Sequence, residues 1–450
     1  MKTPIDDFVR AYAASGTVRY HMPGHKGRGA HGEAYDITEI EGADVLDEAR
    51  GIIAGSEANA SSLFGTEKTV YSCGGSSQCV RAMVYLAVTS GRGRKVLAAR
   101  NAHRSFVDAC ALCDAEIVWM MPEAGEGLCS CRVSPERLEA ALGKDDFCAV
   151  YLTSPDYLGA TQDIGALSAV CRRHRVPLLC DNAHGAYLRF LPRDLHPASR
   201  GAALCCDSAH KTLPVLTGGA YLHCAAGDAF GFAGRMKGAM ALFCTTSPSW
   251  LILASLDRCN ACLAGDYPAR LARTVRRIEA VKNALFEAGW RLLPSDPLRI
   301  TLCAASGEDG CALASRLRRE GAECEYASPE HLVLMLSPHN RAEEIAALPA
   351  LLGPAKGEPE ARVPFAMPEP ERAMTPREAV FSAWEEAAAE DAVGRVCALP
   401  RTPCPPGVPV VCAGEIISRE AVKIMRAYGI ETVRVAVRPQ KEEKIWSIPT

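Results

Sequence analysis

Two stretches of the sequence decide the fold: VPLLCDNAHGAY at residues 176–187 and AALCCDSAHK at residues 202–211. Each opens with a short apolar run typical of a buried strand, and the runs end on Asp181 and Asp207. Similar runs alternate with helical stretches from about residue 66 to residue 225, the pattern of a parallel sheet with helices on both faces. We therefore predict an α/β fold with a mainly parallel seven-stranded sheet, whose strands are 69–72, 95–99, 116–120, 149–153, 176–180, 202–206 and 220–224.

The rest of the chain separates into smaller units. Outside the large domain we expect a long amphipathic helix at 266–288, strands at 298–302 and 332–336 around a helix at 310–321, a helix at 375–389, and irregular extended chain at 401–409. The predicted division is an N-terminal arm and loop (1–40), a large domain (41–265), a smaller α/β domain (266–352), a linker rich in proline and charge (353–374) and a C-terminal region (375–450).

The composition argues against several classes of protein. The 450 residues carry 50 Lys and Arg against 53 Asp and Glu, a near-neutral balance that argues against nucleic acid as the main partner. No apolar run approaches the roughly 18 residues of a membrane span, and the acidic N-terminus lacks the apolar core of a secretion signal. We therefore expect a cytoplasmic protein that does not act at a membrane.

The 21 cysteines are the unusual feature of the composition. CxxC pairs at Cys110/Cys113 and Cys259/Cys262 are compatible with zinc or redox chemistry, but both lie in helix-like sequence without histidine at ligand spacing. We interpret them as thiols packed in helices, and we expect no metal site. Such thiol usage fits a reducing compartment.

A lysine and a carboxylate stand where open α/β sheets bind ligands, beyond the carboxyl ends of the strands. Asp181 ends one predicted strand, and Lys211 follows another. A lysine can form a Schiff base with an aldehyde cofactor, and an acid can keep a pyridinium nitrogen protonated, which is the pair that pyridoxal phosphate requires. Taken singly, Lys211 could be a surface lysine and Asp181 a helix cap, but their combination favours a pyridoxal-phosphate site.

The sequence also contains a candidate phosphate seat. A glycine turn ending at Gly75 precedes Ser76 and Ser77 at an expected helix start, where N–H groups and hydroxyls can bind an anion. Ser208 and His210 flank the lysine and could add contacts. The alternative for this turn is a plain helix cap by Ser76.

A cofactor ring also needs side chains to lie against. His103 follows the predicted strand at 95–99, so it too stands at a carboxyl end and could stack on one face of the ring. Ala183 could lie on the other face. Taken alone, His103 could equally be a core or surface histidine, but three separate strand ends contribute His103, Asp181 and Lys211.

At these residues the chain resembles the Orn/Lys/Arg decarboxylases, which are fold type I pyridoxal-phosphate enzymes. The resemblance rests on DNAHGAY (181–187), SAHK (208–211), NAHRS (101–105) and HMPGHKG (21–27), and it extends more weakly into TPREAVFS (375–382) and PCPPGVPVVCAGE (403–415). The chain looks like the short bacterial form of the family, without the extra N-terminal wing domain.

The resemblance implies a role for each matching residue. Lys211 would be the Schiff-base lysine, Asp181 the partner of the pyridinium nitrogen and His103 the stacking group. The implied phosphate contacts are Ser76, Ser77, Ser208 and His210, with Thr246 and Ser247 from a segment that reaches a neighbouring subunit's cofactor. That segment implies a homodimer with shared active sites, and higher oligomers stay open. In one departure, Asn182 replaces the family's usual Glu, and we expect it next to the ring, where it could tune substrate choice.

The implied reaction is decarboxylation of a basic amino acid, arginine, lysine or ornithine, to agmatine or a diamine in polyamine biosynthesis. Lys211, His184 and His210 stay alternatives for the group that protonates Cα. A cationic substrate side chain needs an acidic partner, because a buried unpaired charge is costly. The candidates are Asp44, Asp156 and Glu325, each of which could instead be a surface carboxylate.

Two rival functions stay open from the sequence. An aminotransferase or another lyase would use the same cofactor, although no arginine stands out in a motif that would clamp an α-carboxylate. A non-catalytic protein that binds pyridoxal phosphate is the other, less favoured because all the chemical residues are present.

Overall fold

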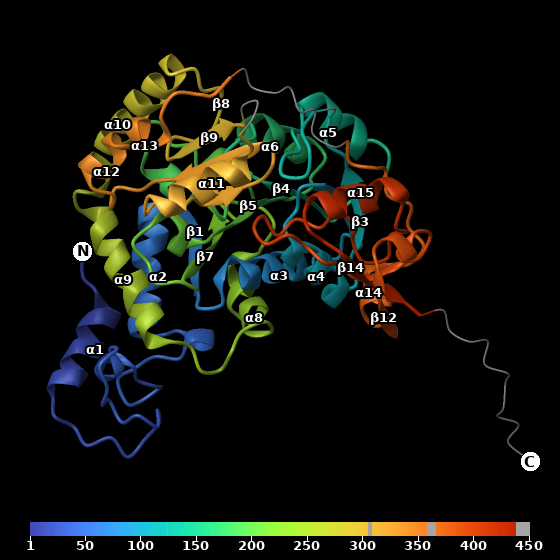
Figure 1. The fold of residues 1–450 in the computed structure, drawn as a ribbon. Coiled ribbons are helices and arrows are strands. Elements are labelled where there is room, and N and C mark those ends of the chain that lie inside the picture. Colours follow the sequence, from blue (N-terminus) through green and yellow to red (C-terminus); the bar gives the residue numbers. More distant parts are fainter. Residues whose placement is uncertain (124, 305–307, 358–365, 438–450) are drawn as a thin grey trace, which may run out of the picture.

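The fold is built on one large sheet. The computed structural model describes residues 1–123, 125–304, 308–357 and 366–437. The strand order is β1-β7-β6-β5-β4-β2-β3, and all strands run parallel except β7, which is antiparallel to both of its neighbours (Figure 1). The strands are β1 (Thr66–Ser72), β2 (Lys95–Ala99), β3 (Glu116–Met120), β4 (Ala149–Thr153), β5 (Leu178–Asp181), β6 (Leu204–Asp207) and β7 (Ala220–Ala225). The predicted α/β fold with a mainly parallel seven-stranded sheet is confirmed.

Strand ends differ slightly from those predicted. The predicted ends at 180 and 206 are each one residue short, because β5 and β6 run on to include Asp181 and Asp207. The start of β5 falls after Pro177, which has no N–H to give to a neighbouring strand. β1 begins earlier than predicted, at Thr66, because its first residues pair with the end of β7.

Helices cover both faces of the sheet. The first face carries α3 (Gly75–Val88), α4 (Arg104–Cys113) and α8 (Met236–Ala241), and the second carries α5 (Pro135–Leu142) and α6 (Ile164–Arg173). Successive strand residues alternate between the two cores, as Leu97 and Ala98 do. Burial of both faces leaves the strand ends as the place where polar side chains can gather.

The N-terminal arm packs on its own chain. The helix α1 (Pro4–Ala14) lies against α9 (Trp250–Ala264) and α2 (Ile52–Phe64). The backbone N–H groups of Ile5 and Asp6 donate to Asp257 Oδ2 at 2.8 and 3.0 Å. Figure 1 shows α1 and the chain that follows it on the side of the molecule away from the C-terminal elements.

The long helix α10 (Tyr267–Glu287) leads from the large domain into a second, antiparallel sheet with the order β10-β11-β9-β8. Its strands are β8 (Leu292–Leu293), β9 (Arg299–Cys303), β10 (Tyr326–Ala327) and β11 (His331–Met335), and its helices are α11 (Gly310–Arg319), α12 (Ala342–Ala346) and α13 (Leu348–Leu352). The helix and strands predicted in this region are present, with ends shifted by one or two residues.

The C-terminal region forms a third sheet beside α4 and β3 (Figure 1). It contains α14 (Pro376–Val380), β12 (Trp384–Ala388), β13 (Cys397–Leu399), α15 (Arg419–Ala427) and β14 (Thr432–Ala436), with the antiparallel strand order β12-β14-β13. The predicted helix at 375–389 is therefore wrong beyond Val380. Its Glu and Ala residues favour a helix, but backbone pairing with β14 outweighs that local preference. Part of the predicted linker, 358–365, and the last residues, 438–450, lie outside the described residues.

Both CxxC pairs lie in helices, as predicted. Cys110 and Cys113 belong to α4, and Cys259 and Cys262 belong to α9. All 21 cysteines are free thiols, and burial raises the pKa of the Cys110 and Cys259 thiols. These thiols act as small apolar side chains in the core.

In the described part of the chain, no helix has the length and apolarity needed to cross a membrane.

Candidate active site

A cavity of about 290 Å³ opens at the carboxyl ends of the central strands. Thr153 and Asp181 line it at the ends of β4 and β5, and Lys211 lines it from α7 (Ala209–Thr212), the short helix that follows β6. The structure brings together these sequence-predicted residues on its wall: Gly75, Ser76, Ser77, His103, Asp181, Ala183, His184, Ser208, His210 and Lys211. Residues from separate strand ends meet here because parallel strands present their carboxyl ends along one edge.

Lys211 and His184 form a close pair. Lys211 Nζ lies 2.8 Å from His184 Nε2. Burial lowers the pKa of the Lys211 amine, and the Asp181 and Glu325 carboxylates oppose this shift. Burial, with the charge of Lys211, also lowers the pKa of His184 well below its usual range. A neutral imidazole can accept a proton from this amine or return one, so the pair is suited to proton exchange at Lys211 Nζ.

Asp181 is held by hydrogen bonds on both oxygens. Its Oδ2 accepts the Tyr151 hydroxyl at 3.1 Å, and its Oδ1 accepts the Ala183 N–H at 3.1 Å. The Cys206 thiol lies 3.6 Å from the same Oδ1. Each carboxylate oxygen can accept more than one hydrogen bond, so the oriented carboxylate keeps capacity for an N–H donor in the cavity.

The start of α3 provides an anion seat on the cavity wall. Gly75 has a φ of 71°, a left-handed conformation that favours glycine, and no side chain caps the helix. The Gly75 N–H is donated to the Gly218 carbonyl at 2.8 Å, whereas the next N–H groups, those of Ser76 and Ser77, stay available to an anion. The Ser208 hydroxyl donates to Ser76 Oγ at 2.8 Å, which joins the lysine-bearing loop to the helix start.

His103 is oriented from two sides. Its Nδ1 accepts the Ser105 N–H at 3.1 Å, so the proton of the neutral ring resides on Nε2. On the Nε2 side lies Gly407, where a Cβ would come within 2.5 Å of that nitrogen. The Gly407 carbonyl also accepts the Arg104 N–H at 2.8 Å. Burial lowers the pKa of His103, so the ring is neutral near pH 7.

Sequence reasoning missed two groups of lining residues. One group comes from the C-terminal region: Cys404, Pro405, Pro406 and Val408. The other comes from the large domain: Asn101, Cys129, Thr153, Pro155 and Tyr157. The segment 403–415, which contains the C-terminal group, belongs to the family resemblance. Nothing in its sequence indicated that it packs against His103.

Unpaired polar atoms test whether the cavity fits a cofactor. Asn101 Oδ1, Thr153 Oγ1 and His184 Nδ1 are buried on its wall without a hydrogen-bond partner among the described residues. Buried polar atoms are normally paired, so this wall is suited to a polar ligand. An anion seat, an oriented carboxylate and an amine of lowered pKa match the phosphate, ring nitrogen and aldehyde of pyridoxal phosphate.

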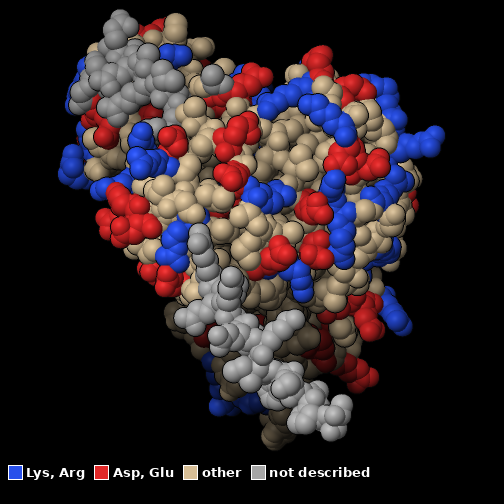
Figure 2. All heavy atoms as spheres, turned by 90° about the vertical axis from the view of Figure 1, so that its right-hand side faces the viewer, with Lys and Arg blue, Asp and Glu red and all other residues tan. Residues whose placement is uncertain are grey.

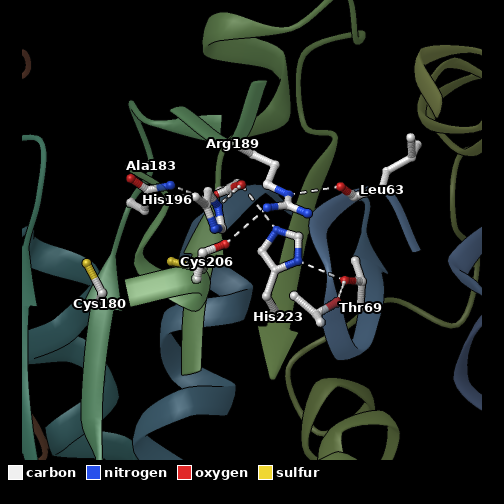
Figure 3. Close-up of polar contacts among 12 residues, drawn as sticks. Leu63, Thr69, Cys180, Ala183, Arg189, His196, Cys206 and His223 are labelled. Atoms are coloured by element: carbon white, nitrogen blue, oxygen red, sulfur yellow. Dashed lines mark hydrogen bonds and ion pairs between the residues drawn. The ribbon is translucent and has the colours of Figure 1, made fainter. Parts of the chain in front are cut away.

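Asp207, the last residue of β6, joins two buried imidazoles, those of His196 and His223, which Figure 3 labels. His196 Nε2 and His223 Nε2 donate to Asp207 Oδ2 at 3.0 and 3.1 Å, and His223 Nδ1 lies 2.8 Å from Thr69 Oγ1. Burial alone would raise the pKa of Asp207, but the charge and hydrogen bonds of the two histidines hold it well below its usual range. The ligand atoms of His196, Asp207 and His223 lie within 4.8 Å of one another, as a metal site would need, but here both Nε2 atoms are hydrogen-bonded to one carboxylate oxygen. We call these three residues and Asn182 the Asp207 network.

Asn182 belongs to this network and not to the cavity. Its Nδ2 donates to Asp207 Oδ1 at 2.6 Å, and the side chain does not line the cavity. The expectation that Asn182 lies next to the cofactor ring is therefore not supported. Asn182 instead connects the end of β5, which carries Asp181, to the end of β6, which precedes Lys211.

Two predicted substrate contacts lie elsewhere. The Asp44 carboxylate accepts backbone N–H groups around the start of α2, from Val45, Arg50, Gly51, Ile53 and Ala54. Asp156 Oδ1 accepts the N–H groups of Leu158 and Ala160 at 2.9 Å, and burial raises the pKa of Asp156 to about 6. Neither carboxylate lines the cavity, because each is used to hold a turn of the backbone.

The third candidate, Glu325, lies just behind the cavity wall. The Tyr157 hydroxyl donates to Glu325 Oε1 at 2.9 Å, and the Tyr157 ring packs edge-on against His184 with 5.1 Å between the ring centroids. Thr246 and Ser247 are exposed and do not line this chain's cavity.

Family comparison identifies the protein class to which this arrangement belongs. The profile of the Orn/Lys/Arg decarboxylase major domain matches residues 3–308, and that of the Orn/Lys/Arg decarboxylase C-terminal domain matches residues 361–429. The chain belongs to the Orn/Lys/Arg decarboxylase family. The predicted resemblance is confirmed, and the chain is a decarboxylase of basic amino acids.

Individual relatives cover nearly the whole chain. The uncharacterized protein YaaO of Bacillus subtilis is 28% identical over 475 residues, covering 96% of this chain and 95% of that protein. An arginine decarboxylase of Bacillus anthracis is 28% identical over 94% of this chain and 92% of its own length.

Solved structures show the same fold at lower sequence identity. The constitutive lysine decarboxylase of E. coli aligns with a TM-score of 0.78 at 18% identity, covering 97% of this chain and 82% of that one. The Sphingomonas wittichii serine palmitoyltransferase aligns with a TM-score of 0.56 at 17% identity, covering 78% and 82%. At these identities the likeness shows the fold alone.

Proposed function

We propose that the decarboxylase uses pyridoxal 5'-phosphate and acts on arginine, lysine or ornithine, releasing agmatine or a diamine for polyamine biosynthesis. The observation that carries the proposal is the meeting of Lys211, Asp181, His103 and the uncapped start of α3 on one cavity. The curated relatives named arginine decarboxylase favour arginine among the three substrates.

In this proposal each side chain on the wall has one task. Bound pyridoxal phosphate supplies an electron sink for the pair released as carbon dioxide leaves the substrate. Lys211 holds the cofactor covalently, Asp181 keeps the ring nitrogen protonated, and His103 and Ala183 lie against the ring. The phosphate is held by the start of α3 with Ser76, Ser77, Ser208 and His210.

The proton that replaces the carboxylate at Cα comes from the Lys211–His184 pair. Their separation of 2.8 Å lets a proton pass between Nζ and Nε2 without movement of either backbone. The other ring nitrogen of His184, Nδ1, has no hydrogen-bond partner among the described residues. We therefore assign Lys211 as the donor and His184 as the hydrogen-bond acceptor that orients its amine.

Glu325 is the proposed partner of the substrate's distal cation. Its hydrogen bond to Tyr157 orients it, and its charge already acts on Lys211. An ammonium or guanidinium group that displaces the Tyr157 hydroxyl would gain a charge-assisted bond. The enzyme would then distinguish substrates by whether their side chain is long enough to span the distance from Lys211 to Glu325.

Thr246 and Ser247 are proposed to complete the phosphate seat of a second subunit. Both are exposed in the single chain, and they lie in the loop between α8 and α9. A homodimer would bury them without changing the fold of either chain. This cytoplasmic enzyme would then have two active sites, each built from two chains.

The test is carbon dioxide release from the three amino acids by the cofactor-loaded chain. We expect release with at least one of them, none with Lys211→Arg, and unchanged release with the control Lys95→Arg, whose side chain is exposed and paired with Asp145. Borohydride reduction should attach the cofactor to Lys211. Amino transfer to a keto acid without carbon dioxide, or labelling of another lysine, would contradict the proposal.

Substitution at Glu325 tests the substrate site separately. Glu325→Gln should lower kcat/KM for the basic substrate by roughly tenfold or more, because a charge-assisted bond becomes a neutral one. The control is Glu323→Gln, an exposed carboxylate paired with Arg318. Equal kinetics for the two variants would remove Glu325 from the substrate site.

A further inference from the structure

A second cavity, lined by arginine, adjoins the active site. It has a volume of about 530 Å³ and shares Ser77, His103 and Cys404 with the first cavity. Its arginines come from α3, the start of α4, the C-terminal extended segment and β14: Arg81, Arg104, Arg401 and Arg434. We call it the arginine cavity. None of these arginines lines the active-site cavity, so the two sites use different cations.

Part of the positive charge in the arginine cavity is balanced. Arg104 Nε lies 3.4 Å from Asp108, and Arg401 lies 2.6 Å from Glu386. Asp108 lines the cavity, whereas Glu386 lies outside its wall. These two pairs leave Arg81 and Arg434 as the source of net charge.

Neither Arg81 nor Arg434 forms an ion pair with a carboxylate of the described residues. Arg434 lies over the Trp384 ring, with its guanidinium carbon 4.9 Å from the ring centroid. The Nε atoms of Arg81 and Arg434 are buried without a hydrogen-bond acceptor in the described part of the chain. Glu386 lies opposite Arg434 in the β12–β14 pair, and the two charges interact. The four arginines of the cavity still outnumber the carboxylates Asp108 and Glu386 by two, so the hollow is suited to an anion.

The charge is local and does not belong to a broad basic surface. On the face shown in Figure 2, blue and red side chains are interspersed over the tan surface. The formal net charge of the whole chain is −3. A large polyanion such as nucleic acid would therefore meet repulsion beyond the cavity, whereas a small anion would not.

We propose that the arginine cavity binds a phosphate-bearing small molecule, separately from the cofactor. A phosphate group has several oxygens for the forked N–H groups of Arg81 and Arg434, and its two negative charges match the two unbalanced cations. The hydroxyls of Ser77, Ser105 and Thr402 also line the cavity and supply neutral donors. Because Ser77 and His103 belong to both walls, such a ligand lies against the active site and alters turnover when it binds.

Calorimetric titration of the cofactor-loaded full chain with inorganic pyrophosphate tests this site. We expect saturable binding that weakens roughly tenfold or more in the double variant Arg81→Gln/Arg434→Gln, because each substitution removes a charged donor. The matched control is Arg258→Gln, an exposed arginine on α9 outside both cavities, which should leave binding unchanged. Circular dichroism of the variants checks that both remain folded.

Three results would overturn the proposal. The first is no saturable heat beyond that of sodium chloride at equal ionic strength. The second is equal affinity in the double variant and in the control. The third is loss of the cofactor's absorption as pyrophosphate binds, which would assign the heat to the phosphate seat at α3. Because the readout is binding, failure here is distinguishable from failure of the proposed reaction.

Discussion

Removing the Asp207 carboxylate should destabilise the protein far more than neutralising it. Asp207→Ala leaves three buried donors without an acceptor: His196 Nε2, His223 Nε2 and Asn182 Nδ2. Each orphaned buried donor costs about 1–3 kcal/mol, and loss of a buried charge offsets part of the sum, so we expect a loss of about 3–6 kcal/mol.

Asp207→Asn should be milder because the network can rearrange. One amide oxygen can still accept both imidazoles. The new NH₂ group faces Asn182, whose Oδ1 is unpaired and can accept it after the Asn182 amide rotates. We expect a loss below about 2 kcal/mol for this variant.

Urea denaturation followed by far-ultraviolet circular dichroism measures the difference. It is done at pH 8, and the control is Glu323→Ala, an exposed carboxylate 2.8 Å from Arg318 that should cost at most about 0.5 kcal/mol. The pKa of Asp207 is depressed by folding, so its contribution is present above about pH 4 and is lost as pH falls through the folded value. Equal losses for Asp207→Ala and Asp207→Asn, or losses no larger than that of the control, would refute the reasoning.

Three further predictions follow from the same contacts. Asn182→Glu should lower the urea midpoint by placing a second carboxylate beside Asp207, and adding Asp207→Asn should recover most of the loss; no recovery would count against direct contact between the two side chains. Gly407→Ala should weaken cofactor binding roughly tenfold by displacing His103, measured by absorbance titration, whereas Gly429→Ala, at a similar left-handed φ with open space around it, should leave binding unchanged. The thermal midpoint should fall as pH drops below about 6.5, because protonation favours the unfolded chain wherever folding lowers a histidine pKa; a flat profile from pH 8 to 5.5 would disprove this for His103, His184 and His223.

The central part of the site was predictable from the sequence because its residues follow strand ends. Strands can be recognised from local apolar runs, and a parallel sheet places their carboxyl ends along one edge. The sequence alone therefore places His103, Asp181 and Lys211 in one region of the fold. The family motifs NAHRS, DNAHGAY and SAHK contain these same three residues.

The errors concern residues whose partners are set by tertiary contact. A buried carboxylate can bind a ligand or hold a backbone turn, and sequence alone does not distinguish them, as Asp44 and Asp156 show. Asn182 does not line the cavity because its side-chain amide donates a hydrogen bond to Asp207. The strand at 384–388 depends on pairing with β14, which lies more than 40 residues further along the chain.

The contact between Gly407 and His103 has a consequence for when the enzyme becomes competent during synthesis. The wall formed by Cys404, Pro405, Pro406 and Val408 is translated after the sheet, the lysine and the anion seat. A nascent chain that stops short of this segment lacks this part of the cavity wall and the contact of Gly407 with His103. Loading of the cofactor should therefore report that translation has passed residue 408, and a product truncated before that point should lose the cofactor while keeping much of its secondary structure.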